Sequence, residues 1–198
     1  MNKLEIFIND LCGVFDNENQ INQELESGKQ IHPKAKHING ICNNKINNLP
    51  DDFDGYFVIE ESYYEQGKFK NVLPHLFLFT LNENDDVVLT SYDIPENISK
   101  ADFRNDNEDL VMDYKELKVS SKFTPMIYKY KDGVYEGSSV SNFSAETEFT
   151  LNERIENGKM YVSEVFRKNG KITFGFVDPI IYEKRVFRKE EYNCHIEY

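Results

Sequence analysis

The sequence lacks any hydrophobic run long enough to cross a membrane, and it is poor in cysteine and in positive charge. Segment 1–15 is interrupted by polar residues and has neither the charged start nor the small-residue cleavage site of a secretory signal. Cys12, Cys42 and Cys194 are an odd number of cysteines without the paired spacing of a metal site. We therefore expect free thiols and a cytoplasmic location.

Basic side chains number 23 against 35 acidic ones, which gives a formal net charge of −12. Nucleic acids and anionic membranes bind to basic surfaces, so we expect neither as a partner unless a local basic patch exists. No nucleophile elbow, phosphate-binding glycine loop or zinc signature is present. His32 and His37 have no third ligand nearby, so we expect no metal and assign no catalytic residue.

Phenylalanine and tyrosine, by contrast, are abundant, at 15 and 12 residues. With 198 residues the chain is long enough for one domain, 1–198, that has its own hydrophobic core. Apolar residues recur at helical spacing from Leu4 to Phe15, which predicts an amphipathic helix. Asp16 is a suitable N-cap for a second, mostly polar helix that Gly28 would end.

The rest of the chain alternates between strand-like runs and turn residues. Strands are predicted at 37–46, 56–65, 69–81, 87–94, 126–130, 134–138 and 180–186, and in three runs separated by Asn157-Gly158 and Asn169-Gly170. Roughly nine or ten strands in up-and-down order predict a mostly β protein, an antiparallel lipocalin-like β-barrel with short N-terminal helices. A sandwich is the alternative. Pro74 predicts an edge or a bulge within 69–81, which leaves a homodimer open.

The hairpin at Asn157-Gly158 gives the first functional indication. Its two-residue turn pairs Glu153 with Val162 and Leu151 with Glu164, which gathers the apolar residues on one face. Glu153 and Glu164 then lie on the face that should be dry. Because burial of unpaired charge is costly, a polar ligand, a buried partner or a water-filled cavity should accompany them.

The second turn is predicted to be a three-residue loop, Lys168 to Gly170, with the glycine in the left-handed conformation. This loop pairs Phe166 with Ile172 and Val162 with Phe176, whereas a two-residue loop would send an apolar residue to the polar side. Phe176 is therefore expected on the inner face and is assigned to ligand binding.

Three separated stretches resemble the CpcT/CpeT type of phycobiliprotein chromophore lyases. They are Gly13-Val14-Phe15-Asp16-Asn17 with Gln20, Phe53-Asp54-Gly55 followed by Phe57 to Tyr64, and Gly175-Phe176 through Asp178-Pro179 to Tyr182 and Arg185. The resemblance implies a lipocalin-like barrel that holds an open-chain tetrapyrrole and delivers it to a cysteine of an acceptor protein. The chain departs from the family at 72–77, where an arginine-bearing segment is expected, and at 138–142, where a cysteine is expected. Both departures affect the pocket, so the resemblance supports the barrel better than the bilin.

A chromophore lyase has to hold, shield and orient its ligand, and carboxylates suit protonated pyrrole nitrogens. Of Glu60 and Glu61, one can face inward, and the alternation favours Glu61. We assign Glu61 and Tyr63 to ligand binding beside Glu153 and Glu164. Ion pairs at a barrel rim are the alternative for these glutamates.

His75 and Arg104 complete the predicted ligand-binding set. His75 lies beside a proline in an apolar strand and is a candidate proton donor, although a hydrogen-bonded core histidine is the simpler interpretation. Arg104 lies in a loop that could cover the barrel mouth and bind a propionate, with a solvated surface arginine as the alternative.

Two functions from different classes follow. The leading hypothesis is a barrel that binds a small hydrophobic ligand, with a bilin or another tetrapyrrole as the candidate; transfer to an acceptor protein would make it lyase-like. The alternative is a ligand-free structural or protein-interaction barrel with a filled core. Absence of any pocket of roughly 300 Å³ or more would favour that alternative.

Overall fold

The computed structural model describes residues 2–185, most of which lie in strands or tight turns. The helices are α1 (Lys3–Leu11) and α2 (Glu18–Glu26), and short 3₁₀ turns lie at Asn43–Lys45 and Tyr114–Glu116. The barrel strands are β1 (Gly13–Asp16), β2 (Lys34–Ile41), β4 (Tyr56–Gln66), β5 (Phe69–Leu81), β6 (Val87–Tyr92), β8 (Met126–Lys131), β9 (Val134–Asn142), β10 (Thr147–Glu156), β11 (Lys159–Lys168) and β13 (Ile180–Lys184). β12 (Lys171–Gly175) pairs with the end of β11, and β3 (Ile46–Asn47) pairs in parallel with β7 (Met112–Asp113).

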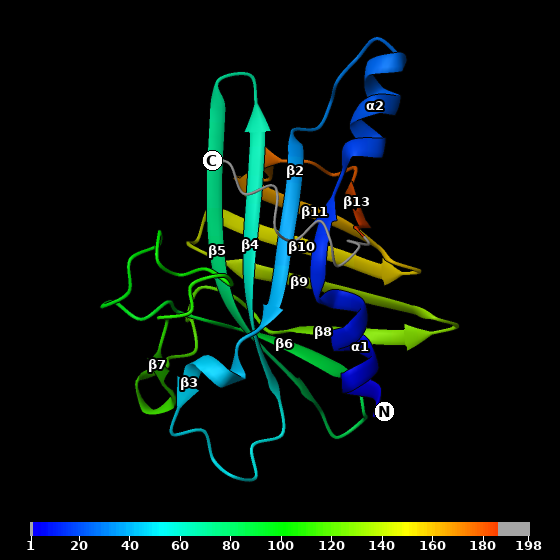
Figure 1. The fold of residues 1–198 in the computed structure, drawn as a ribbon. Coiled ribbons are helices and arrows are strands. Elements are labelled where there is room, and N and C mark those ends of the chain that lie inside the picture. Colours follow the sequence, from blue (N-terminus) through cyan, green and yellow to red (C-terminus); the bar gives the residue numbers. More distant parts are fainter. Residues whose placement is uncertain (1, 186–198) are drawn as a thin grey trace, which may run out of the picture.

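The barrel strands from β1 to β11 form an antiparallel meander, and β13 closes it by pairing with β1 on one side and with β11 on the other. Neighbouring strands follow the order β10-β9-β8-β6-β5-β4-β2-β1-β13-β11, and β11 pairs back with β10 to close the sheet. In Figure 1, β2, β4 and β5 cross the strands β8 to β11 behind them at a steep angle, because strands tilt when a sheet closes on itself. The predicted antiparallel, lipocalin-like barrel with short N-terminal helices is confirmed, and the sandwich alternative is wrong.

α1 lies across one end of the barrel, at the lower right in Figure 1. A capping box fixes its start, since the Asn2 side chain accepts a hydrogen bond from the Glu5 N–H and the Glu5 carboxylate accepts one from the Asn2 N–H. The buried face of the helix consists of Leu4, Phe7, Ile8 and Leu11. The Phe7 ring packs against Phe79 of β5, Tyr128 of β8 and Tyr135 of β9, with centroids 4.8–5.4 Å apart. The helix thereby ties together strands from opposite walls and fills this end.

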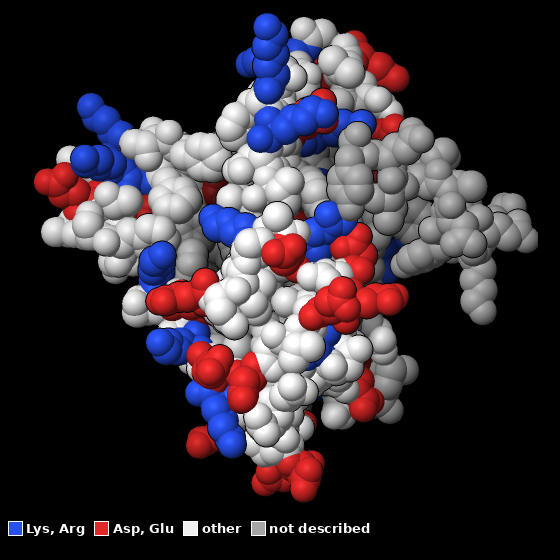
Figure 2. Space-filling model, turned by 60° about the vertical axis from the view of Figure 1, so that its left-hand side comes forward, with Lys and Arg blue, Asp and Glu red and all other residues white. Residues whose placement is uncertain are grey.

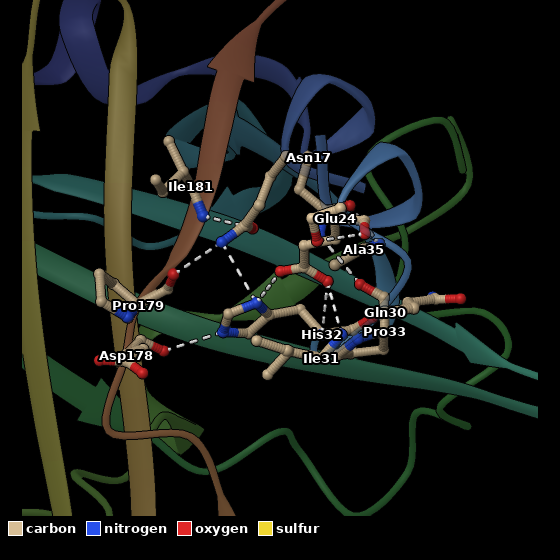
Figure 3. Close-up of polar contacts among 12 residues, drawn as sticks. Asn17, Glu24, Gln30, Ile31, His32, Pro33, Ala35, Asp178, Pro179 and Ile181 are labelled. Carbon is tan, nitrogen blue, oxygen red and sulfur yellow. Dashed lines mark hydrogen bonds and ion pairs between the residues drawn. The ribbon is translucent and has the colours of Figure 1, made fainter. Parts of the chain in front are cut away.

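α2 sits on the rim of the opposite end, beside β2 and β13, and a histidine anchors the loop that follows it (Figure 3). His32 is 3% exposed, with Nδ1 2.5 Å from Glu24 Oε1 and Nε2 3.0 Å from the Asp178 carbonyl oxygen. The other Glu24 oxygen accepts hydrogen bonds from the backbone N–H groups of Ile31 and His32. These contacts hold the rim segment against the chain that enters β13.

The hairpin of β10 and β11 has the predicted register. Glu153 lies opposite Val162 and Leu151 lies opposite Glu164. The turn residues Asn157 and Gly158 have φ values of 48° and 73°, as a type I′ turn requires. Local turn chemistry and strand alternation agree here, which is why the sequence predicts this element well.

The second turn is tighter than predicted. Lys168 pairs directly with Lys171, so Asn169 and Gly170 form a two-residue turn. A bulge between Phe166 and Arg167 supplies the extra residue and sets Phe166 opposite Phe174. The three-residue loop was therefore wrong, because the offset lies in the strand and not in the turn.

Beyond this bulge β12 leaves the wall and β13 replaces it. Gly175 makes the departure at φ 91°, and a Cβ there would lie 1.8 Å from the Glu164 carbonyl oxygen. Val162 then pairs with Ile180 of β13. The predicted pairing of Val162 with Phe176 was therefore wrong.

Residues 93–119 cover the outer face of β4 and β5. They supply Phe103, Leu110 and Met112 to a second core that packs on Phe57 and Ile59 of β4. Both faces of β4 are consequently buried, one against this cover and one inside the barrel.

Asn105 fastens this cover to the wall. Its Nδ2 lies 2.9 Å from Glu61 Oε1 and 3.2 Å from the carbonyl oxygens of Ile38 and Ile59. A Cβ on Gly40 would lie 2.2 Å from Asn105 Oδ1, so the glycine makes room for this side chain.

β5 has an edge where Pro74 lies. Pro74 is opposite Glu61 of β4, whereas pairing with β6 begins only at Leu76. The proline therefore sits on a stretch with one neighbouring strand, as predicted from its missing N–H group.

No helix within residues 2–185 has the length and apolar character needed to span a bilayer. On the face drawn in Figure 2, acidic and basic side chains are interspersed with uncharged ones, without a continuous basic surface.

Candidate functional site

Strand alternation sends a cluster of titratable side chains into the barrel. On β4 the inward residues are Tyr56, Val58, Glu60, Ser62 and Tyr64, since Val58 lies in the main core and Glu60 and Tyr64 contact polar residues of other walls. The luminal cluster comprises His37 of β2, Glu60 and Tyr64 of β4, His75 of β5, Tyr128 of β8, Glu153 of β10, Glu164 of β11 and Tyr182 of β13. Seven strands thus direct ionisable groups toward one interior region.

Register places this cluster between two apolar layers. Along β10 and β11 the pair Ile155 and Met160 is nearest α1, and Phe149 with Phe166 forms the layer farthest from it. Between these layers lie Glu153 and then Glu164, so Glu164 is one step nearer the end opposite α1.

Phenylalanines line that opposite end. The rings of Phe123, Phe143, Phe149, Phe166 and Phe174 form a continuous chain of contacts with centroids 4.7–6.3 Å apart. Phe143 is 39% exposed and Phe174 is 65% exposed, whereas Phe149 is buried. We call these five residues the phenylalanine rim. They present an apolar surface that passes from solvent into the barrel.

Glu60 and His37 form an ion pair inside the barrel. His37 Nδ1 lies 3.5 Å from Glu60 Oε2, and the Ser62 hydroxyl donates to the other Glu60 oxygen at 2.9 Å. Burial disfavours the Glu60 charge, but the His37 imidazolium, together with His75 and the Ser62 hydroxyl, outweighs burial and holds the pKa of Glu60 at about 2. Burial likewise opposes the His37 charge, yet the Glu60 carboxylate raises the His37 pKa above its usual value.

The pKa values of Glu153 and Glu164 are raised, in contrast to that of Glu60. Burial, reinforced by the nearby Glu60 charge, raises the pKa of Glu153 to about 7, although the Tyr128 hydroxyl donates to its carboxylate. Burial also raises the pKa of Glu164, which accepts a hydrogen bond from the Tyr64 hydroxyl at 3.2 Å. Burial raises the pKa values of both tyrosines well above the usual range, so they act as donors.

Two features indicate that the interior has unused binding capacity. The inward residues Glu60, His75, Glu153 and Glu164 keep partial solvent exposure, so they are not sealed from solvent. His37 Nε2 and the Tyr182 hydroxyl are buried without a hydrogen-bond partner among the described residues. Buried polar atoms are normally satisfied, so these atoms indicate a place for water or a ligand.

The predicted residues separate into two groups. Glu153, Glu164 and His75 lie in the luminal cluster, and His75 is opposite Glu60 with its ring stacked on Phe77 at 5.4 Å. Phe176 lies at the rim against the His32 ring, 5.0 Å away, outside the cluster.

Glu61, Tyr63 and Arg104 lie on the outer side of the β4 wall. Glu61 accepts hydrogen bonds there from Tyr63 and from the Asn105 N–H. Arg104 forms a bidentate ion pair with Asp106 in the cover. The choice of Glu61 as the inward glutamate was wrong, because the cover makes the outer face of β4 as apolar as the inner one.

Sequence reasoning missed Glu60, His37 and the three tyrosines as a unit. The alternating polar set Glu60, Ser62 and Tyr64 was the available signal on β4. Because Glu153 and Glu164 point inward, this alternating set would also have placed Glu60 inside, where carboxylates from facing walls converge.

Two hollows lie outside the barrel. A groove of about 800 Å³ follows the outer faces of β8 to β11, lined in part by Lys129, Arg154 and Arg167. These cations already pair with Asp86, Glu156 and Glu148, respectively. A smaller hollow of about 190 Å³ lies beside β3 and β7. Within residues 2–185 no group of three potential ligands is arranged to hold a metal ion.

Comparison of the chain with known protein families, with curated protein sequences and with solved structures found no match. The resemblance to the CpcT/CpeT lyases therefore stays a prediction that rests on three sequence stretches.

Proposed function

We propose that the barrel binds a small hydrophobic molecule in its lumen, with a polar end at the luminal cluster and an apolar body against the phenylalanine rim. The observation that carries the proposal is the convergence of Glu60, Glu153 and Glu164 on partly exposed interior positions beside His37, whose Nε2 is buried without a hydrogen-bond partner among the described residues. A structural core gains nothing from three inward carboxyls, because each has to be desolvated.

The arrangement of layers supports an amphiphilic ligand. Aromatic side chains offer large apolar contact area, and polar groups deeper in a pocket fix orientation. Phe149 and Phe166 meet the lumen directly above Glu164. A molecule that enters past the rim would therefore meet the carboxyls last.

A bilin or another tetrapyrrole is the candidate ligand, because it combines a long conjugated body with pyrrole nitrogens that donate to carboxylates. Transfer to a cysteine of an acceptor protein would be the lyase-like activity, in a cytoplasmic setting that the free thiols of Cys12 and Cys42 suit. Arg104 on the outer wall leaves propionates without the partner that we had assigned to them.

The test is an absorbance and fluorescence titration with biliverdin, phycocyanobilin and haem. Saturable binding with a shifted band, weakened at least tenfold by Glu164→Gln and unchanged by Glu148→Gln, is the expected result. Glu148 is the matched control because it lies on β10 with its side chain outside the lumen, 3.9 Å from Arg167. Binding that Glu164→Gln leaves intact would place the ligand elsewhere, for example in the outer groove.

The alternative, a ligand-free structural or protein-interaction barrel, predicts a different result. Tetrapyrroles and a neutral dye such as Nile red would then fail to saturate the protein, and a homodimer or partner complex would be the object of study. The partial exposure of the inward carboxyls favours the ligand-binding barrel. The hollows of about 800 Å³ and 190 Å³ lie outside the barrel and do not support a luminal site.

A further inference from the structure

We infer that the luminal ligand is an organic cation whose charged nitrogen binds at Glu164 and Glu153, and that its entry releases a proton to solvent. This inference rests on the proposed luminal binding function and specifies the charge of the ligand. It follows from an imbalance of charge inside the barrel together with unpartnered polar atoms beside it.

The imbalance is visible in the geometry of the two walls. Glu60 is matched by His37 at 3.5 Å and by His75 opposite it on β5. Across the lumen Glu153 and Glu164 have tyrosine hydroxyls as hydrogen-bond donors, from Tyr128 and Tyr64. Neither carboxyl has an ion pair with a described Lys or Arg side chain, so the only opposite charges that act on them are those of His37 and His75, which also face Glu60.

The surrounding strands complete this environment. The groups that act on Glu153 and Glu164 are His37 of β2, Glu60 and Tyr64 of β4, His75 of β5, Tyr128 of β8 and Tyr182 of β13. Burial of the carboxyls and the Glu60 charge favour their protonated forms. An empty lumen can therefore stay close to neutral by holding protons on Glu153 and Glu164.

A ligand cation changes that balance. Its charge favours the ionised carboxylate, so a carboxylic acid and a cation become a carboxylate–cation pair while the proton passes to water. An unpaired cation in this interior would otherwise be strongly disfavoured, because the medium is poorly polarisable. Glu164 meets the ligand first, since it is nearer the phenylalanine rim than Glu153.

Three probes with one apolar body and different charges test the inference: 1-naphthylmethylammonium, 1-naphthalenemethanol and 1-naphthoate. Affinities are measured by calorimetry between pH 5 and pH 8.5 in buffers of different ionisation enthalpy, which reports protons released per ligand. For the cation we expect the Kd to fall as pH rises through about 7, the pKa of Glu153, and to level off once both carboxyls are ionised. The neutral and anionic probes should bind more weakly and without this dependence.

The variants locate the effect. Glu164→Gln should remove most of the preference for the cation over the alcohol, whereas Glu148→Gln should keep both affinities and the proton release. Equal affinity for cation and alcohol, preference for naphthoate, or cation binding without proton release would overturn the inference while luminal binding stands. Failure of all three probes while a tetrapyrrole binds would also overturn it. If no probe and no tetrapyrrole binds, the proposed function itself fails.

Discussion

Burial raises the pKa of Glu153 from 4.5 to about 7, and the Glu60 charge adds to the shift. The unfolded chain gives up this proton near the ordinary pKa, so between pH 4.5 and 7 the folded state binds more protons. Stability therefore falls as pH rises through that window, by at most about 3 kcal/mol.

Glu153→Gln should remove this loss of stability at higher pH, because the amide keeps an acceptor for Tyr128 and carries no charge. We expect the free energy of unfolding to rise by about 1–3 kcal/mol at pH 8 and to change little at pH 4.5. Urea denaturation at both pH values is the measurement, with Glu148→Gln as the control. A lower stability of Glu153→Gln at pH 8 would contradict the assignment.

The two partners of the Glu60–His37 ion pair contribute to stability in different pH ranges. The low pKa of Glu60 contributes stability above pH 4.5 that is lost as pH falls toward 2. The raised pKa of His37 contributes stability below its unfolded value, 6.5, that is lost as pH rises through the folded pKa.

Glu60→Gln should therefore lower the His37 pKa, since the Glu60 carboxylate contributes more than Glu164 and Glu153 to raising it. Titration of the imidazole signals by NMR would measure a downward shift of about one unit or more. Glu65→Gln, exposed near the end of β4, should leave the titration unchanged. An unchanged His37 in Glu60→Gln would show that another group holds its proton.

At the scale of elements, the cover of residues 93–119 depends on one amide. Asn105→Ala would remove three hydrogen bonds, leave Glu61 with fewer donors and open a gap over Gly40. We expect a loss of about 2–4 kcal/mol and faster amide exchange throughout the cover. Asn97→Ala, exposed in the same segment, is the control. Normal protection of the cover in Asn105→Ala would refute its role as a fastener.

The rim segment after α2 gives a second element-scale prediction. Glu24→Ala would leave the N–H groups of Ile31 and His32 and the His32 ring without their acceptor. The expected cost is about 1–3 kcal/mol, with exchange of the Ile31 and His32 amides accelerated most. Glu26→Ala, exposed on the same helix, should change neither stability nor exchange at these amides.

Elements whose local chemistry agrees with the fold were predictable, and those that depend on distant segments were not. Asn157 and Gly158 determine the β10–β11 register, so Glu153 and Glu164 were placed correctly inside. On β4 the cover hides the outer face, and no local signal shows that residues 93–119 fold back over it. The bulge at Phe166 was missed for a similar reason, because the entry of β13 determines where β12 must leave.

For the molecule as a whole, α1 couples opposite walls of the barrel. Phe7→Ala would leave a cavity among Phe79, Tyr128 and Tyr135, at an expected cost of about 3–5 kcal/mol. Thermal and urea unfolding would measure it, with Ile6→Ala, which is 43% exposed, as the control. Equal stability of the two variants would mean that α1 is not part of the barrel's cooperative unit.

The position of α1 also determines by which end of the barrel a ligand would enter and leave. The buried side chains of α1 close one end of the barrel, so a ligand that enters past the phenylalanine rim would have to leave by that same end. In the proposed function, the end of the ligand that binds at Glu164 would arrive first and leave last. Any acceptor that takes the ligand while it is still held would therefore react with its trailing, apolar end.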